Sequence, residues 1–182
     1  MKKADIIKAR KIAADYYKKA GIVMTENELE NIEVADFGLG IHESIGLQLV
    51  TYVNNEKYCA KEMVLFPYQI CPEHTHRPLP EINYVGKQET FRCRYGTVEL
   101  FVEGDGTPFE IHGVTPDRLP YFTVFHRKSL VPGEQYTIKP NTRHWFQAGE
   151  DGAVISEFST SSFDELDVFT DPAIERIPKA DD

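Results

Sequence analysis

The chain has 182 residues and a formal net charge of −9. This charge disfavours nucleic acid and anionic membranes as partners, because proteins that bind them normally present a stripe of Lys and Arg that is not evident here. The sequence shows no apolar stretch near the ~20 residues of a membrane-spanning helix and no signal-peptide core. The three cysteines lack the pair spacings of zinc ribbons and redox motifs, and a reducing cytoplasm suits them. We therefore expect a cytoplasmic protein.

The N-terminal segment predicts one amphipathic helix. Between residues 4 and 19, apolar side chains recur at helical intervals among lysines: Ile6, Ile7, Ala9, Ile12, Ala13, Tyr16 and Tyr17. Gly21 follows where a C-terminal cap is expected. We expect this helix to pack against the outside of a sheet.

From about residue 30, the hydrophobic pattern changes to a period of two, with β-branched and aromatic runs between turn residues. The predicted strands cover residues 45–53, 58–66, 89–102, 121–130, 135–138, 144–147 and 153–158. Turn signals separate them, including one at 149–152. Many short strands without helices between them favour an all-β sandwich or barrel. We predict a helical extension (1–30), a β-barrel (31–172) and a C-terminal tail (173–182).

Two imidazoles lie close together in the segment Cys71 to His76. His74 and His76 are two positions apart, so on a strand both side chains share one face, roughly 6.6 Å apart along it. Glu89 begins a later run in which alternation places it on the apolar side, together with Phe91. A buried carboxylate there is costly without a cation, which suggests that one metal ion binds between these groups.

A second motif delivers another histidine. Gly133 and Pro140 mark turns on either side of a short strand, and His144 opens the next one. With the earlier His-x-His, Glu and Gly pattern, this arrangement resembles the two motifs of the cupin superfamily. The resemblance implies a cupin barrel, a jelly roll of antiparallel strands. It also implies a metal site formed by His74, His76, Glu89 and His144.

The chain departs from the cupin pattern in one spacing. Cupins keep three or four residues between the second His and the Glu, whereas twelve separate His76 from Glu89 here. Glu81 is therefore an alternative ligand. We prefer Glu89, because Gly96 follows it at the expected offset and Glu81 lies in a Pro-rich loop. His126 is an outside candidate for the pocket.

Within the cupins, a wider pattern resembles the D-lyxose ketol-isomerases. The matching segments are 59–62, 71–74, 87–91, 156–160 and 164–172. The resemblance implies that the chain converts D-lyxose to D-xylulose, with D-mannose to D-fructose as a plausible second reaction. It also implies Mn²⁺, and we expect a homodimer.

Aldose–ketose interconversion moves a proton from C2 to C1 through an enediol, so it needs an acid–base group that is not a metal ligand. Glu157 is our candidate, because alternation places it on one face with Ile155. Lys61 alternates with Met63, and an inward ammonium could stabilise an enediolate. The competing interpretation leaves both side chains in solvent, with Ser156 and Phe158 turned inward instead.

The donor set leaves the metal open. Imidazole accepts Zn²⁺, Fe²⁺, Co²⁺, Ni²⁺ and Mn²⁺, whereas the carboxylate and sugar hydroxyls favour Mn²⁺. Three other functions suit a cupin: a phosphoglucose isomerase, an Fe(II) dioxygenase and a non-catalytic carbohydrate-binding protein. A phosphosugar enzyme needs cations at the barrel mouth, so Lys61, Arg92 and Arg94 would have to converge there. Alternation points both arginines outward.

Overall fold

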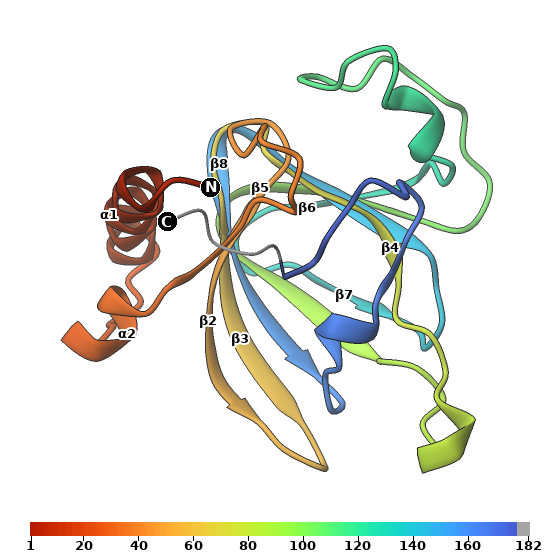
Figure 1. Cartoon of the computed structure of the whole chain (residues 1–182), viewed down its shortest axis with the longest axis horizontal. Coiled ribbons are helices and arrows are strands. Elements are labelled where there is room, and N and C mark those ends of the chain that lie inside the picture. Colours follow the sequence, from red (N-terminus) through yellow and green to blue (C-terminus); the bar gives the residue numbers. More distant parts are fainter. Residues whose placement is uncertain (178–182) are drawn as a thin grey trace.

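Nine β-strands pair into one strongly curled antiparallel sheet in the computed structural model, which describes residues 1–177 (Figure 1). The elements in chain order are α1 (Lys3–Lys19), α2 (Glu26–Glu30), β1 (Glu33–Ala35), β2 (Leu47–Asn54), β3 (Cys59–Leu65), β4 (Ile70–Thr75), η1 (Pro80–Ile82), β5 (Glu89–Val102), η2 (Leu119–Tyr121), β6 (His126–Leu130), β7 (Gln135–Ile138), β8 (His144–Ser159), η3 (Asp164–Leu166) and β9 (Val168–Phe169). The predicted all-β fold, a barrel of antiparallel strands with an N-terminal helix, is confirmed.

Strand β8 connects the two halves of the barrel. One edge of β8 pairs with β4 near His144 and with β3 from Ala153 to Ser159. The other edge pairs with β5 along most of its length, from Val102 opposite His144 to Glu89 opposite Ser159. The first residues of β5 and of β8 thus lie at opposite ends of this pair, and the curl of the sheet brings their side chains into one interior.

The turn predicted at 149–152 is wrong, because β8 continues through it. Gly152 adopts a φ of +75° and Gly96 on β5 a φ of +69°, which glycine reaches without the Cβ clash that other residues meet. Register shifts mark β-bulges on both sides of Gly96. The two glycines therefore bend a continuous strand pair where the sequence suggested a break. The strand predicted to begin at 121 begins only at His126, after the short 3-10 helix η2.

Replacement of Gly96 by alanine should destabilise the fold by more than about 2 kcal/mol. An added Cβ would lie 1.9 Å from the Gly152 carbonyl oxygen, in addition to the strain of the positive φ. Gly21→Ala is a matched control, because Gly21 has the same φ of +69° with nothing near its Cβ position. Urea unfolding should show a loss of about 1–2 kcal/mol for the control. Equal losses in both variants would contradict the clash.

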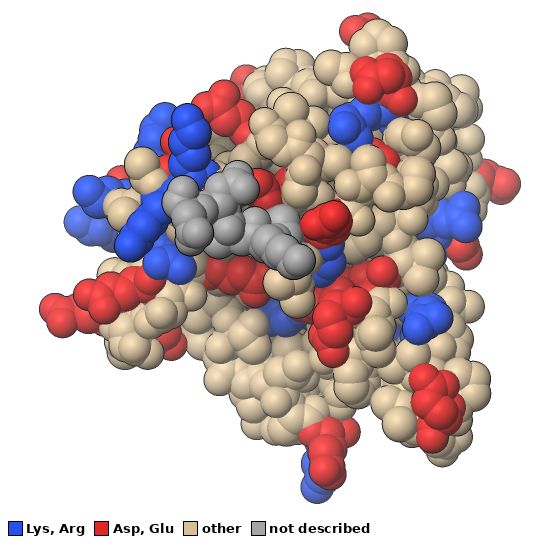
Figure 2. All heavy atoms as spheres, viewed as in Figure 1, with Lys and Arg blue, Asp and Glu red and all other residues tan. Residues whose placement is uncertain are grey.

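The helix α1 covers the outside of the sheet, as predicted. Ala9, Ala13, Tyr16 and Tyr17 are buried, and the Tyr17 hydroxyl donates a 2.8 Å hydrogen bond to a backbone carbonyl of β3. Figure 2 shows basic side chains gathered over α1, with acidic side chains spread over the rest of that face. Among the described residues, no helix is long and apolar enough to cross a membrane.

The segment after β8 folds back over the barrel and is anchored to β4. Phe169 and Val168 in β9 pair with His74 and Thr75. The buried Glu73 accepts hydrogen bonds from the hydroxyls of Thr170 and Thr123. These anchors hold the segment 160–177 against the interior of the barrel. Residues 178–182 of the predicted tail lie outside the described part of the chain, and the three-part division of the chain stays a prediction.

Candidate metal centre and active site

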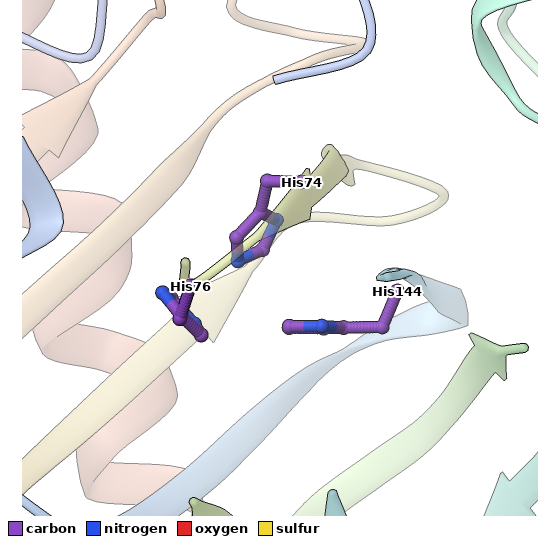
Figure 3. A group of neighbouring side chains, drawn as sticks. All are labelled: His74, His76 and His144. Carbon is purple, nitrogen blue, oxygen red and sulfur yellow. The ribbon is translucent and has the colours of Figure 1, made fainter. Parts of the chain in front are cut away.

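Three histidines point toward one another inside the barrel. His74 is on β4, His76 follows the end of that strand, and His144 begins β8 (Figure 3). One ring nitrogen from each lies within 4.8 Å of the others, and all three residues are buried. The backbone pairing of His74 with His144 explains the approach, since adjacent strands carry the two rings on the same face. This group could hold a metal ion.

Glu89 lies beside the histidines. Its Oε1 atom is 2.9 Å from Nε2 of His144 and 3.3 Å from Nε2 of His76, and the residue is 1% exposed. Glu81, the alternative ligand, is exposed on η1. The structure therefore brings together the four residues that the cupin resemblance implied. It leaves Glu81 outside the cluster.

Each histidine is oriented through its other ring nitrogen. Nδ1 of His74 donates to the carbonyl of Pro72 at 2.8 Å, and Nδ1 of His144 donates to that of Thr142 at 2.9 Å. Nδ1 of His76 faces Oδ1 of Asp167 at 2.5 Å. These partners fix the tautomer and direct each Nε2 lone pair inward, as in protein metal sites.

The inward atoms fit a cation. Among the described residues, Nε2 of His76, Nε2 of His144 and Oε1 of Glu89 are buried without a hydrogen-bond partner. Such atoms normally find a partner, and a divalent ion would satisfy all three at once. Burial holds the pKa of His74 well below its usual value, which leaves its ring neutral and able to ligate. Burial also lowers the pKa of His76, but Glu89 and Asp167 outweigh it and raise this pKa to about 9.

A buried lysine joins this cluster to the proposed acid–base residue. Nζ of Lys87 lies 2.9 Å from Oε2 of Glu89 and 2.5 Å from Oε1 of Glu157. Burial lowers the pKa of Lys87, but the two carboxylates outweigh burial and hold it well above its usual value. Glu157 is 3% exposed and lines the same cavity as His74 and His76, whereas Phe158 is 52% exposed. The inward register expected for Glu157 is the one observed.

Lys61 also faces the cavity, but its ammonium is already engaged. It lies opposite Glu157 on the neighbouring strand and is 4% exposed. Its Nζ lies 2.6 Å from Oδ2 of Asp164 and donates to the Ser162 hydroxyl at 3.1 Å. The competing interpretation, a solvated lysine, does not describe this side chain. Its partners nevertheless place it beside the segment after β8.

The remaining candidates lie elsewhere. His126 contacts the carbonyl of Asp105 and does not line the cavity. Arg92 donates to Gln135, and Arg94 donates to Ser156. Neither arginine lines the cavity with Lys61, so the three cations do not converge as a phosphosugar site would require.

Four charged residues that line the site were assigned no role from the sequence: Lys87, Asp164, Asp167 and Arg176. Lys87 had a usable signal, because it is two positions before Glu89 and alternation places it on the same face. Asp167 is 91 positions from His76, and no local pattern links the two. Arg176 reaches the cavity from the predicted tail.

Asp167→Asn is expected to weaken Mn²⁺ binding by about 10- to 100-fold, the usual effect of losing the partner of a metal-ligating histidine. The amide still fills the space, but it no longer offers a carboxylate to the ring of His76. Asp151→Asn, at an exposed position of β8, is the control and should keep wild-type affinity. Titration calorimetry measures both. Unchanged affinity in Asp167→Asn would contradict the role of Asp167 in orienting His76 toward the metal.

Comparison with known proteins identifies the family. Residues 16–182 match the D-lyxose isomerase family. A D-lyxose ketol-isomerase of Thermofilum sp. (strain ex4484_79) is 56% identical over 171 residues, 94% of each chain. A D-lyxose/D-mannose isomerase of Thermosediminibacter oceani is 56% identical over 182 residues, covering 100% of this chain and 99% of its own. The resemblance inferred from the sequence is confirmed.

Solved structures show the same fold at much lower identity. The L-ribose isomerase of Acinetobacter sp. DL28 in complex with L-ribose superimposes with a TM-score of 0.78 at 15% identity, covering 96% of this chain and 94% of its own. That of Cellulomonas parahominis with L-ribose gives 0.75 at 17% identity, covering 99% and 98%. At these identities the likeness shows the fold alone, so the assignment rests on the sequence matches. The chain belongs to the D-lyxose isomerase family.

Proposed function

We propose that this chain interconverts free aldoses and ketoses, with D-lyxose and D-xylulose as the main pair and D-mannose and D-fructose as the second. One observation supports it best. A carboxylate outside the proposed ligand set, that of Glu157, lines the same cavity as His74, His76 and Glu89, and Glu89 in turn contacts His144. The names of the two relatives supply the aldoses, D-lyxose and D-mannose.

The reaction requires a group that removes the proton from C2 and returns it to C1. A bound divalent cation would polarise the neighbouring sugar oxygens. Glu157 carries the proton, because Glu89 is directed at the histidines and Asp164 is paired with Lys61. The Ser159 hydroxyl donates to Oε1 of Glu157 at 3.1 Å, and Lys87 contacts the same oxygen. The other oxygen, Oε2, is thereby left for the substrate.

The cations of the cavity have separate roles in this proposal. Lys87 bridges Glu89 and Glu157, so it fixes the distance between the metal cluster and the proton carrier. Lys61 lies across from Glu157 and supplies positive charge near the developing enediolate. Its contact with Asp164 holds that charge in place.

Mn²⁺ is the proposed metal. Three imidazoles and one carboxylate, with open positions for sugar hydroxyls, suit a borderline to hard divalent ion. Zn²⁺, Fe²⁺, Co²⁺ and Ni²⁺ are the alternatives. The homodimer and the cytoplasmic location stay predictions from the sequence.

A single anaerobic assay tests the function. The protein is supplied with Mn²⁺ under nitrogen, and ketose formation is followed from D-lyxose, D-mannose, D-xylose, D-glucose and glucose 6-phosphate. We expect turnover of D-lyxose to be fastest, because misplacing a hydroxyl leaves buried polar groups unpaired at about 1–3 kcal/mol each. Faster turnover of glucose 6-phosphate would favour a phosphosugar isomerase. Binding of sugars without turnover would leave a carbohydrate-binding protein, and turnover that needs O₂ would indicate an oxygenase.

A further inference from the structure

The cavity beside the metal cluster is too small for a sugar. Its volume is about 40 Å³, which holds roughly three water molecules. A pentose has about ten non-hydrogen atoms, and ligand sites usually measure 300 Å³ or more. Part of the wall must therefore move before a substrate enters.

The walls of the cavity differ in the interactions that hold them in place. Most of the lining residues belong to β2, β3, β4, β5 and β8, and backbone hydrogen bonds join these strands to their neighbours. A further part of the lining comes from the segment after β8, which folds back over the barrel (Figure 1). This segment contributes the side chains of Asp164 and Arg176. Moving a side chain there breaks no strand pairing.

Asp164 and Arg176 separate the small cavity from a larger groove. Both residues also line this groove, a space of about 390 Å³ between β1 and the segment after β8. Among the described residues, no other residue lines both the cavity and the groove. The groove side includes Glu33 and Val34. Displacing the two side chains would therefore join the cavity to the groove.

Two ion pairs hold the Arg176 side chain in this partition. Nη2 of Arg176 is 3.5 Å from Oδ2 of Asp164, and Nη1 is 2.6 Å from Oε1 of Glu33. The Arg176 side chain is 13% exposed, while those of Asp164 and Glu33 are 25% and 46% exposed. Because Glu33 and Asp164 are partly exposed, water can replace these contacts when the guanidinium moves toward the groove.

A chain of contacts between charged side chains runs along the cavity, from the metal cluster to the groove. Glu89 contacts Lys87, and Lys87 contacts Glu157. Lys61, opposite Glu157, contacts Asp164, and Asp164 contacts Arg176. A sugar whose C1 and C2 lie at Glu157 thus extends its far carbons toward Arg176.

We propose that Arg176 closes the far end of the sugar cavity, so that it admits substrate by swinging into the groove beside β1 and sets the length of sugar accepted. The inference rests on the proposed function. A bound pentose already displaces the guanidinium toward the groove. A hexose has one further hydroxymethyl group, which must displace it further.

The test compares Arg176→Ala with wild type by two measurements. The first is the rate at which methyl methanethiosulfonate labels Cys71, a buried thiol of the cavity wall, followed by peptide mass spectrometry without sugar. The buried Cys59 and Cys93 do not line the cavity and report global opening. We expect labelling of Cys71 to rise about fivefold, with the other two unchanged. Unchanged labelling of Cys71 would overturn the proposal.

The second measurement is kcat/KM for D-mannose divided by that for D-lyxose. We expect Arg176→Ala to raise this ratio by about tenfold, as the space for one more carbon unit predicts. A constant ratio would refute the role in sugar length. Arg127→Ala is the matched control: Arg127 pairs with Glu99 on the outside of the barrel and should alter neither readout.

The test also distinguishes loss of the fold from failure of the proposed function. If Cys59 and Cys93 label faster as well, Arg176→Ala has lost its fold, and Glu33→Gln replaces it. That substitution weakens only the ion pair at Nη1 of Arg176, so we expect a smaller rise in the labelling rate of Cys71. No rise there would count against the proposal. If wild type converts neither sugar, the proposed function fails, while the labelling of Cys71 still tests the closure.

Discussion

Glu157→Gln should leave the fold and the metal content intact and lower the turnover of D-lyxose by about 10²- to 10⁴-fold, the usual loss for an acid–base group. The amide has nearly the same shape and keeps an oxygen that can accept from Lys87 and Ser159, the present partners of Glu157. It cannot take the proton from C2. Exchange of that proton with deuterated water should therefore fall together with turnover.

Glu62→Gln is a closely matched control. Glu62 is on β3 next to Lys61, is also buried, and accepts a 2.7 Å hydrogen bond from Ser156, the neighbour of Glu157. It does not line the cavity. Burial raises the pKa of Glu62, and an amide at this position still offers an oxygen that accepts from Ser156. Near-normal turnover in Glu157→Gln, or equal losses in both variants, would remove Glu157 from the chemistry.

The sequence was most informative where local pattern and motif agreed. The two-residue spacing of His74 and His76, and the offset of Gly96 from Glu89, needed only strand periodicity and the cupin resemblance. These predicted a barrel with the four residues in one interior, and the structure has both features. The amphipathic pattern of the first helix was equally local, and so was the inward register of Glu157.

The sequence was least informative where distant segments meet. Asp167 supports His76, and Arg176 contacts Asp164, only because the chain folds back over the barrel after β8. No periodicity connects these positions. The error at 149–152 has a different cause, because glycine with a positive φ serves a bend inside a strand as well as a turn. Only the pairing of β8 with β5 decides between the two.

The metal provides the second large effect. Glu89→Ala should abolish stoichiometric binding of Mn²⁺, whereas Glu81→Ala, at an exposed position of η1, should keep one ion per chain. Burial raises the pKa of Glu89, but the charges of Lys87, His76 and His144 outweigh burial and hold it well below its usual value. The carboxylate is therefore ionised and ready to ligate at neutral pH. Elemental analysis after gel filtration measures the metal content.

Stability should change with metal content, because an ion that binds only the folded chain stabilises it by mass action. At ~100 times its dissociation constant, Mn²⁺ should add about 2.7 kcal/mol to the wild-type free energy of unfolding. In a chain of 182 residues, this corresponds to a Tm increase of about 5–10 °C. The increase should be absent in Glu89→Ala and intact in Glu81→Ala, since Oε1 of Glu89 lies beside the Nε2 atoms of His76 and His144 and Glu81 is exposed on η1. Loss of the metal in Glu81→Ala, with retention in Glu89→Ala, would reverse the choice of carboxylate.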